Sequence, residues 1–102
     1  GVRRAVEQSA WVAAQAAESK RTQWQSFAQA LAAQTTASNR TRRAWELGEA
    51  PLAEYLLTLR NLRQTRLGEA QARIDALQAS ALVRIDAHAL WHSKEAHADA
   101  PQ

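Results

Sequence analysis

The first half of the chain carries one stripe of apolar or bulky side chains at helical spacing. Its members are Val6, Ala10, Ala13, Ala17, Lys20, Trp24, Phe27, Leu31 and Trp45. Successive members are separated by three or four residues, except that a polar stretch precedes Trp45. This alternation is typical of a helix with a single packing face. Residues 34–39 weaken the stripe and form either a break between two helices or a continuous helix lined with small polar side chains. Because neither Gly nor Pro interrupts them, we expect one helix from about residue 2 to residue 46.

Several local signals place a tight connection between two helices at residues 47–50. Gly48 suits the left-handed position that ends a helix. Pro51 follows three residues later and suits the first turn of a new helix, where its missing N–H costs nothing. Three arginines precede the turn, while Glu49 and Glu54 follow it, so that the charges complement the dipoles of both helix ends.

The second half carries another stripe with the same alternation of three and four. Its members are Leu52, Leu56, Leu59, Arg63, Leu67, Ala70, Ile74, Leu77, Ala81, Ile85 and His88. Positions 52, 63, 74 and 85 are eleven apart, which keeps them on one face of a nearly straight helix. We expect this second packing stripe to lie on a helix from about residue 51 to residue 91. The pattern is lost afterwards, so residues 93–102 are predicted to form a flexible tail.

Together these segments predict an all-α fold, a long antiparallel helical hairpin of the coiled-coil type over residues 1–92. Bulky apolar residues are few, because Ala supplies about half of the 46% that is hydrophobic. The hairpin therefore buries only a thin seam, is marginal alone and is expected to seek partners. The helical pattern is already present at the first residues, which suggests a segment of a longer protein. No stretch approaches the length of a membrane-spanning helix, and no signal-peptide pattern is present.

The residues that could carry chemistry form no convincing site. His88 and His92 are four apart and share a helix face with Glu95 one turn further, but two histidines are a weak metal signal without more ligands. Serines and carboxylates are present without a nucleophile elbow or a Gly-rich phosphate loop. We therefore expect no enzymatic activity and no cofactor or metal.

A nucleic-acid interface is also weakly indicated. The net charge is +3 with acidic and basic residues interleaved, and there is no cysteine for a disulfide or a thiolate metal site. The arginines of the second helix lie around much of its circumference rather than along one phosphate-binding stripe. They are Arg60, Arg63, Arg66, Arg73 and Arg84. A solvated or interhelical charge ladder is the preferred interpretation.

One segment resembles a known family. Residues 43–62 read Arg-Ala-Trp-Glu-Leu-Gly-Glu-Ala-Pro-Leu-Ala-Glu-Tyr-Leu-Leu-Thr-Leu-Arg-Asn-Leu. This wording resembles the TolC-like outer membrane factors, the outer membrane efflux proteins, whose second repeat has an aromatic-x-x-Gly turn before a Leu-rich stretch. Trp45 takes the aromatic place and Gly48 the turn glycine, in wording most similar to the heavy-metal cobalt-zinc-cadmium efflux branch. About twenty residues carry the specific similarity.

The resemblance implies that the chain is the C-terminal coiled-coil segment of an outer membrane protein, in its periplasmic portion. Three protomers of that family form an α-helical barrel, which joins a periplasmic adaptor and an inner-membrane pump of the RND type to export solutes, here heavy-metal cations. The adaptor would dock at the tip, and Glu54 would line the pore constriction, while Leu57 stands where a second acidic residue is common. The docking residues implied are Trp45, Leu47, Gly48, Glu49 and Leu52.

Two other functions compete with this one. The first is a self-associating helical interaction module, for example a dimer that forms a four-helix bundle without a transport role. The second is a basic helical nucleic-acid binder. Only the Trp45-x-x-Gly48 turn and the leucines that follow it favour the efflux component, because a generic bundle needs a turn but not this wording.

Overall fold

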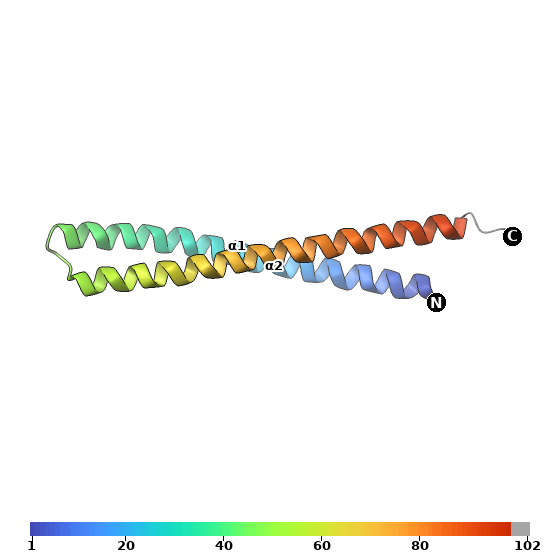
Figure 1. Cartoon of the computed structure of the whole chain (residues 1–102), viewed down its shortest axis with the longest axis horizontal. Helices are drawn as coiled ribbons and strands as arrows, with labels where there is room; N and C mark the ends of the chain where they lie inside the picture. Colours follow the sequence, from blue (N-terminus) through green and yellow to red (C-terminus); the bar gives the residue numbers. More distant parts are fainter. Residues whose placement is uncertain (99–102) are drawn as a thin grey trace. The chain divides into compact units, whose positions relative to one another are not determined.

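The computed structural model describes the backbone of residues 1–98 and the side chains of residues 1–92. It contains two helices, α1 (Val2–Glu46) and α2 (Leu52–Ala98), and no strand in this part of the chain (Figure 1). The predicted all-α antiparallel helical hairpin is confirmed, and α1 runs without a break through residues 34–39. Neither helix has an apolar stretch long enough to cross a membrane within the described residues.

The second helix extends further than the sequence pattern indicated. We expected it to end near residue 91, whereas α2 continues to Ala98. Of the predicted flexible tail at 93–102, residues 99–102 lie outside the described part of the chain, and only the backbone of 93–98 is described. Loss of an apolar stripe therefore does not mark a helix end here, because the residues beyond 91 include strong helix formers such as Ala, Lys and Glu.

The turn after α1 has the hydrogen bonds of a Schellman motif. The N–H of Glu49 donates to the carbonyl of Ala44 at 2.8 Å, and the N–H of Gly48 donates to the carbonyl of Trp45 at 3.0 Å. Gly48 has a φ of 72°, the left-handed conformation that glycine adopts without a steric penalty. The predicted left-handed position of Gly48 is confirmed.

Pro51 lies at the start of α2 but one position earlier than a first-turn residue. Its carbonyl accepts hydrogen bonds from the N–H of Glu54 at 3.1 Å and of Tyr55 at 3.5 Å, and the helix begins at Leu52. Pro51 is thus the N-cap residue, whose carbonyl accepts the first hydrogen bonds of the helix. Glu54 lies in the first turn of α2, as predicted from the dipole argument.

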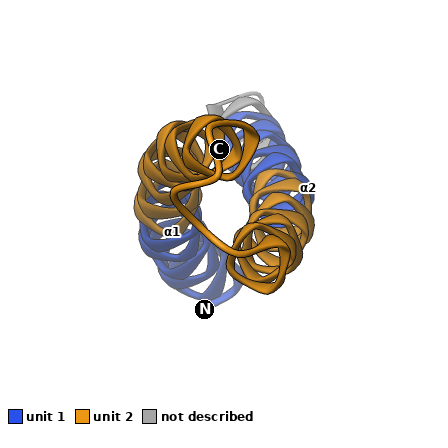
Figure 2. Ribbon diagram, turned by 90° about the vertical axis from the view of Figure 1, so that its left-hand side faces the viewer, with its two compact units in different colours: residues 1–21, 74–102 blue, residues 22–73 orange. Residues whose placement is uncertain are grey.

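The chain divides into two compact units (Figure 2). Unit 2 comprises residues 22–73, namely the second half of α1, the turn and the first half of α2. Unit 1 pairs residues 1–21 of α1 with the part of α2 that begins at residue 74. Each unit is a pair of antiparallel helix segments.

The packing face of α1 agrees with the predicted stripe. The side chains of α1 that are buried or half-buried along this face are Val6, Ala10, Ala13, Ala17, Lys20, Trp24, Leu31, Gln34, Ser38 and Thr41. Phe27 and Trp45 are exceptions within the predicted stripe, because they remain 40% and 39% exposed. The face continues through the weak stretch, where Ser38 is among the most buried residues of the chain at 4% exposure. Small polar side chains therefore replace apolar ones on the same face, and the helix does not break.

The packing face of α2 is not the one predicted. Its buried and half-buried members at alternating spacings of three and four, here called the inner seam, are Tyr55, Thr58, Leu62, Thr65, Glu69, Ala72, Ala76, Ala79, Val83, Asp86 and Leu90. Gly68, Ala70, Asp75 and Ser80, outside this alternation, are half-buried as well. The large members of the predicted stripe, here called the outer stripe, are exposed: Leu52, Leu56, Leu59, Leu67, Ile74, Leu77 and Ile85. Small side chains let two helices approach closely, and the most buried seam residues are alanines. The prediction ranked positions by size and therefore chose the wrong face.

Candidate functional site

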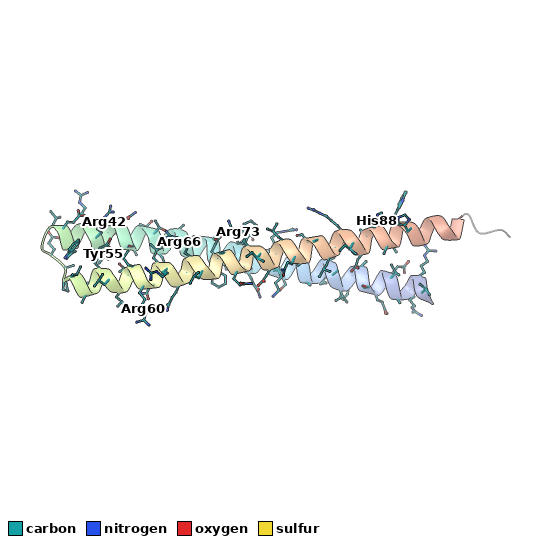
Figure 3. All side chains as sticks on the ribbon, in the orientation of Figure 1. Arg42, Tyr55, Arg60, Arg66, Arg73 and His88 are labelled. Atoms are coloured by element: carbon teal, nitrogen blue, oxygen red, sulfur yellow. The ribbon has the colours of Figure 1, made fainter. Side chains whose placement is uncertain are left out.

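The predicted docking tip contains a stacked aromatic pair. The rings of Trp45, at the end of α1, and Tyr55, in the second turn of α2, lie 5.5 Å apart between centroids at an interplanar angle of 17°. Figure 3 shows Tyr55 close to the turn. Stacking of this kind contributes about 0.5–1.5 kcal/mol beyond simple burial. Trp45 thus braces the turn, while 39% of it remains exposed.

The other predicted tip residues surround this pair. Leu47 is 64% exposed and Leu52 is 46% exposed, so two large apolar side chains flank the turn without cover in this chain. Glu49 and Glu54 are exposed as well. The five predicted docking residues thus run from the end of α1 through the turn to the first residue of α2, and Glu54 lies in the first turn of α2. The pore-lining role of Glu54 stays a prediction.

Two carboxylates of α2 contact α1 through hydrogen bonds that single-helix patterns do not reveal. In unit 2, the indole N–H of Trp24 donates to Oε1 of Glu69 at 3.0 Å. In unit 1, the hydroxyl of Ser9 donates to Oδ2 of Asp86 at 3.3 Å. Both carboxylates belong to the inner seam and bond across the two helices; the Trp24–Glu69 bond is partly buried and the Ser9–Asp86 bond is exposed. Each bond ties a specific residue of α1 to one of α2 and so helps to set the register of its unit.

A close contact between Phe27 and Gly68 explains a glycine in the middle of α2. A Cβ placed on Gly68 would lie 2.5 Å from Cε1 and 2.9 Å from Cδ1 of the Phe27 ring. Real Cβ atoms do not approach a ring carbon that closely, so the ring occupies the space that any larger residue would need. Glycine inside a helix otherwise destabilises it by about 1 kcal/mol relative to alanine.

The outer stripe is a row of large apolar side chains that stays exposed in this chain. Its exposed fractions range from 36% at Leu59 to 66% at Leu67. The same face carries Arg63 and His88, which are exposed too. Full burial of one such Leu or Ile side chain is worth about 1.5–3 kcal/mol, so the stripe can contribute several kcal/mol to association with another surface.

The residues considered for chemistry are arranged as follows. All five arginines of α2 named above are exposed, and Arg60 points away from α1 (Figure 3). Nε2 of His88 and Nε2 of His92 lie 2.8 Å apart. The side chain of Glu95, the third ligand considered from sequence, lies outside the described residues. No group of three or more His, Cys, Asp or Glu side chains is placed to hold a metal ion in the part of the chain that the structure describes.

Comparison with known proteins found no related protein. No protein-family model, no curated protein and no solved structure matches the chain. The assignment to the outer membrane efflux proteins therefore stays a prediction from the sequence of residues 43–62.

Proposed function

We propose that this hairpin is an assembly element whose two faces have separate tasks. The inner seam joins its own two helices, and the outer stripe packs against further helices. The observation that carries this proposal is the exposure of the outer stripe, where Leu67, Leu77 and Ile85 are each more than 60% exposed. A helix that is apolar on a second face is typical of one that is covered on both sides in its assembly.

The more specific form of the proposal is an efflux function. The hairpin would be part of the periplasmic α-barrel of an outer membrane efflux channel, in a tripartite RND-type system that exports heavy-metal cations. In such a barrel each helix packs against neighbours on two sides. The inner seam would form the contact on one side, and the outer stripe would form the contact on the other. Support comes from the resemblance at residues 43–62 together with this second apolar face.

The turn would be the docking tip for a periplasmic adaptor in this proposal. Leu47 and Leu52 offer exposed apolar contacts beside the Trp45–Tyr55 stack, and the Schellman motif holds the turn in one conformation. A rigid turn with exposed leucines suits a helical partner, because little conformational entropy is lost on binding. The inner-membrane pump would supply the energy, so the hairpin itself would act without catalysis or a nucleotide.

The second candidate function is self-association as a four-helix bundle. The same outer stripe favours it, because two copies could cover each other's apolar faces without any other protein. The two candidates differ in stoichiometry: the channel needs three copies, and the simplest bundle needs two.

Cysteine cross-linking tests these alternatives, because the chain has no cysteine of its own. Leu67→Cys and Leu77→Cys place thiols on the outer stripe, and Leu57→Cys and Leu82→Cys place them on exposed positions outside it. We expect cross-links to helices of the same assembly from the stripe positions only, with products up to the trimer. Products that stop at the dimer would favour the four-helix bundle. If all four cysteine variants gave only the monomer and no cross-linked product, the result would contradict both functions.

A second experiment addresses docking at the turn. Leu47→Glu or Leu52→Glu introduces a charge into the proposed contact, and Val12→Glu does the same at an exposed position in the other unit. In cells that carry only the variant protein, we expect the turn variants to lose recovery of the adaptor and tolerance to heavy-metal salts. Val12→Glu should retain both. Wild-type tolerance in Leu47→Glu and Leu52→Glu would contradict the docking role while leaving the assembly proposal intact.

A further inference from the structure

The histidine pair of α2 has a geometry that neither packing nor the proposed function uses. His88 and His92 are separated by one helical turn, with Nε2 atoms 2.8 Å apart and ring centroids 4.2 Å apart at an interplanar angle of 84°. Both side chains are exposed, and Figure 3 shows His88 projecting outward from α2 on the side away from α1. The pair lies in unit 1, whereas the turn and its proposed docking residues lie in unit 2.

The separation of the two nitrogens matches a particular coordination geometry. Two ligands bound at about 2.0 Å to one ion, at a right angle, are about 2.8 Å apart, whereas a tetrahedral angle would separate them by about 3.3 Å. Tetragonal coordination by nitrogen ligands is characteristic of Cu(II) and Ni(II), and imidazole is a preferred ligand of both.

We propose that His88 and His92 form a bidentate chelate for a divalent transition-metal ion that favours tetragonal geometry, Cu(II) or Ni(II). The two Nε2 atoms would occupy adjacent positions of the ion. The site is open because both rings lie on the surface of α2. This inference does not depend on the efflux proposal, since it uses only the spacing and geometry of one helical turn.

The chelate competes with a hydrogen bond between the two rings. At 2.8 Å one Nε2 carries the proton and donates it to the other Nε2. Metal binding requires both lone pairs, so the donating ring must carry its proton on Nδ1 instead, a tautomer change without net proton loss. Because the two nitrogens converge only when residues 88–92 are helical, the ion would bind the helical state and stabilise this turn of α2.

The test is a titration of the full chain with Cu(II) and with Ni(II) in a buffer that does not bind metals. We expect one ion per chain, and an electron paramagnetic resonance spectrum of the Cu(II) form with two equatorial nitrogens. His88→Gln and His92→Gln should each weaken binding by at least about tenfold, since even loss of an outer-shell group costs that much. His97→Gln removes the third histidine and serves as the matched control, with binding retained.

Circular dichroism of each variant without metal checks that helix content is unchanged, so a loss of binding reports the ligand and not the fold. Unchanged affinity in His88→Gln and His92→Gln would overturn the proposal. So would an equal loss in His97→Gln, or one ion per two chains with a doubled mass, which would indicate a bridge between molecules. Binding of Zn(II) but neither Cu(II) nor Ni(II) would overturn the tetragonal assignment.

Discussion

The two faces of α2 differ in composition: the inner seam has small residues at its most buried positions and includes Glu69 and Asp86, whereas the outer stripe consists of leucine and isoleucine. The inner seam is most buried at Ala72, Ala76 and Ala79, with exposures of 6–8%, whereas Leu67 and Leu77 on the outer stripe are 66% and 62% exposed. Hydrophobicity alone would place the leucines inside. The small residues are inside because they permit close approach of two helices, and the large ones remain available for other surfaces. Size therefore distinguishes the contact within the chain from the proposed contact with partners.

The two faces also repeat with different periods. The inner seam recurs every seven residues, for example at 55, 62, 69, 76, 83 and 90, whereas positions 52, 63, 74 and 85 of the predicted outer face recur every eleven. A seven-residue repeat drifts by about 20° per heptad on a straight helix, whereas an eleven-residue repeat stays nearly in line or drifts in the opposite sense. The faces therefore change their angular separation along α2. A helix that follows the outer stripe would need a different path from the one that α1 follows along the seam.

The largest effect is expected when a large residue replaces a small one in the inner seam, which tests whether the seam requires small residues. Ala76→Leu should lower the free energy of unfolding by about 1–3 kcal/mol, because the added methylenes have no space between the helices. The control is Ala81→Leu, the same change at an exposed position of the same helix. Urea unfolding followed by circular dichroism measures both variants at equal protein concentration. Equal stability of the two variants would show that the seam does not require small residues.

The sequence predicted α1 better than α2 for a reason that specific residues make clear. In α1 the bulky residues Trp24 and Leu31 lie on the same face as Ala10 and Ala17, so a size-weighted stripe coincides with the real packing face. In α2 several of the bulky residues, such as Leu67, Leu77 and Ile85, lie on the face that this chain does not cover. A single sequence cannot distinguish a face that packs within the chain from one that packs elsewhere, because both are apolar at helical spacing.

For the turn and the candidate sites too, the sequence predicted local features but not contacts between the two helices. The ends of the helices near the turn followed from Gly48 and Pro51, whose backbone constraints act locally. The spacing of His88 and His92 was also visible, since it lies within one helix. In contrast, the contacts of Trp24 with Glu69 and of Phe27 with Gly68 depend on the register between α1 and α2, which local patterns do not specify. The docking residues came from the resemblance and stay a prediction.

A polar contact in the seam offers a smaller test of the comparison. Trp24→Phe removes the N–H that donates to Glu69 and keeps most of the apolar volume. Because the acceptor is a half-buried carboxylate, we expect a loss of about 1–2 kcal/mol in the free energy of unfolding. Glu69→Gln keeps an oxygen acceptor and should cost less. A double-mutant cycle of Trp24→Phe with Glu69→Ala, which removes the acceptor, isolates the bond, and a coupling energy near zero would mean that the bond contributes nothing to the seam.

The smallest change in stability is expected for substitution of Gly68, but its sign should depend on whether Phe27 is present. In the wild-type background Gly68→Ala should destabilise the hairpin or leave it unchanged, because the new methyl group must displace the Phe27 ring. In a Phe27→Ala background the same substitution should stabilise it by about 1 kcal/mol, the ordinary preference of a helix interior for alanine over glycine. Thermal unfolding of the four proteins of this cycle gives the comparison. Since Phe27 is 40% exposed, its ring has room to rotate outward. If Gly68→Ala stabilises both backgrounds equally, the Phe27 ring rotates outward without an energetic cost. The glycine is then not required for close packing of the helices in unit 2.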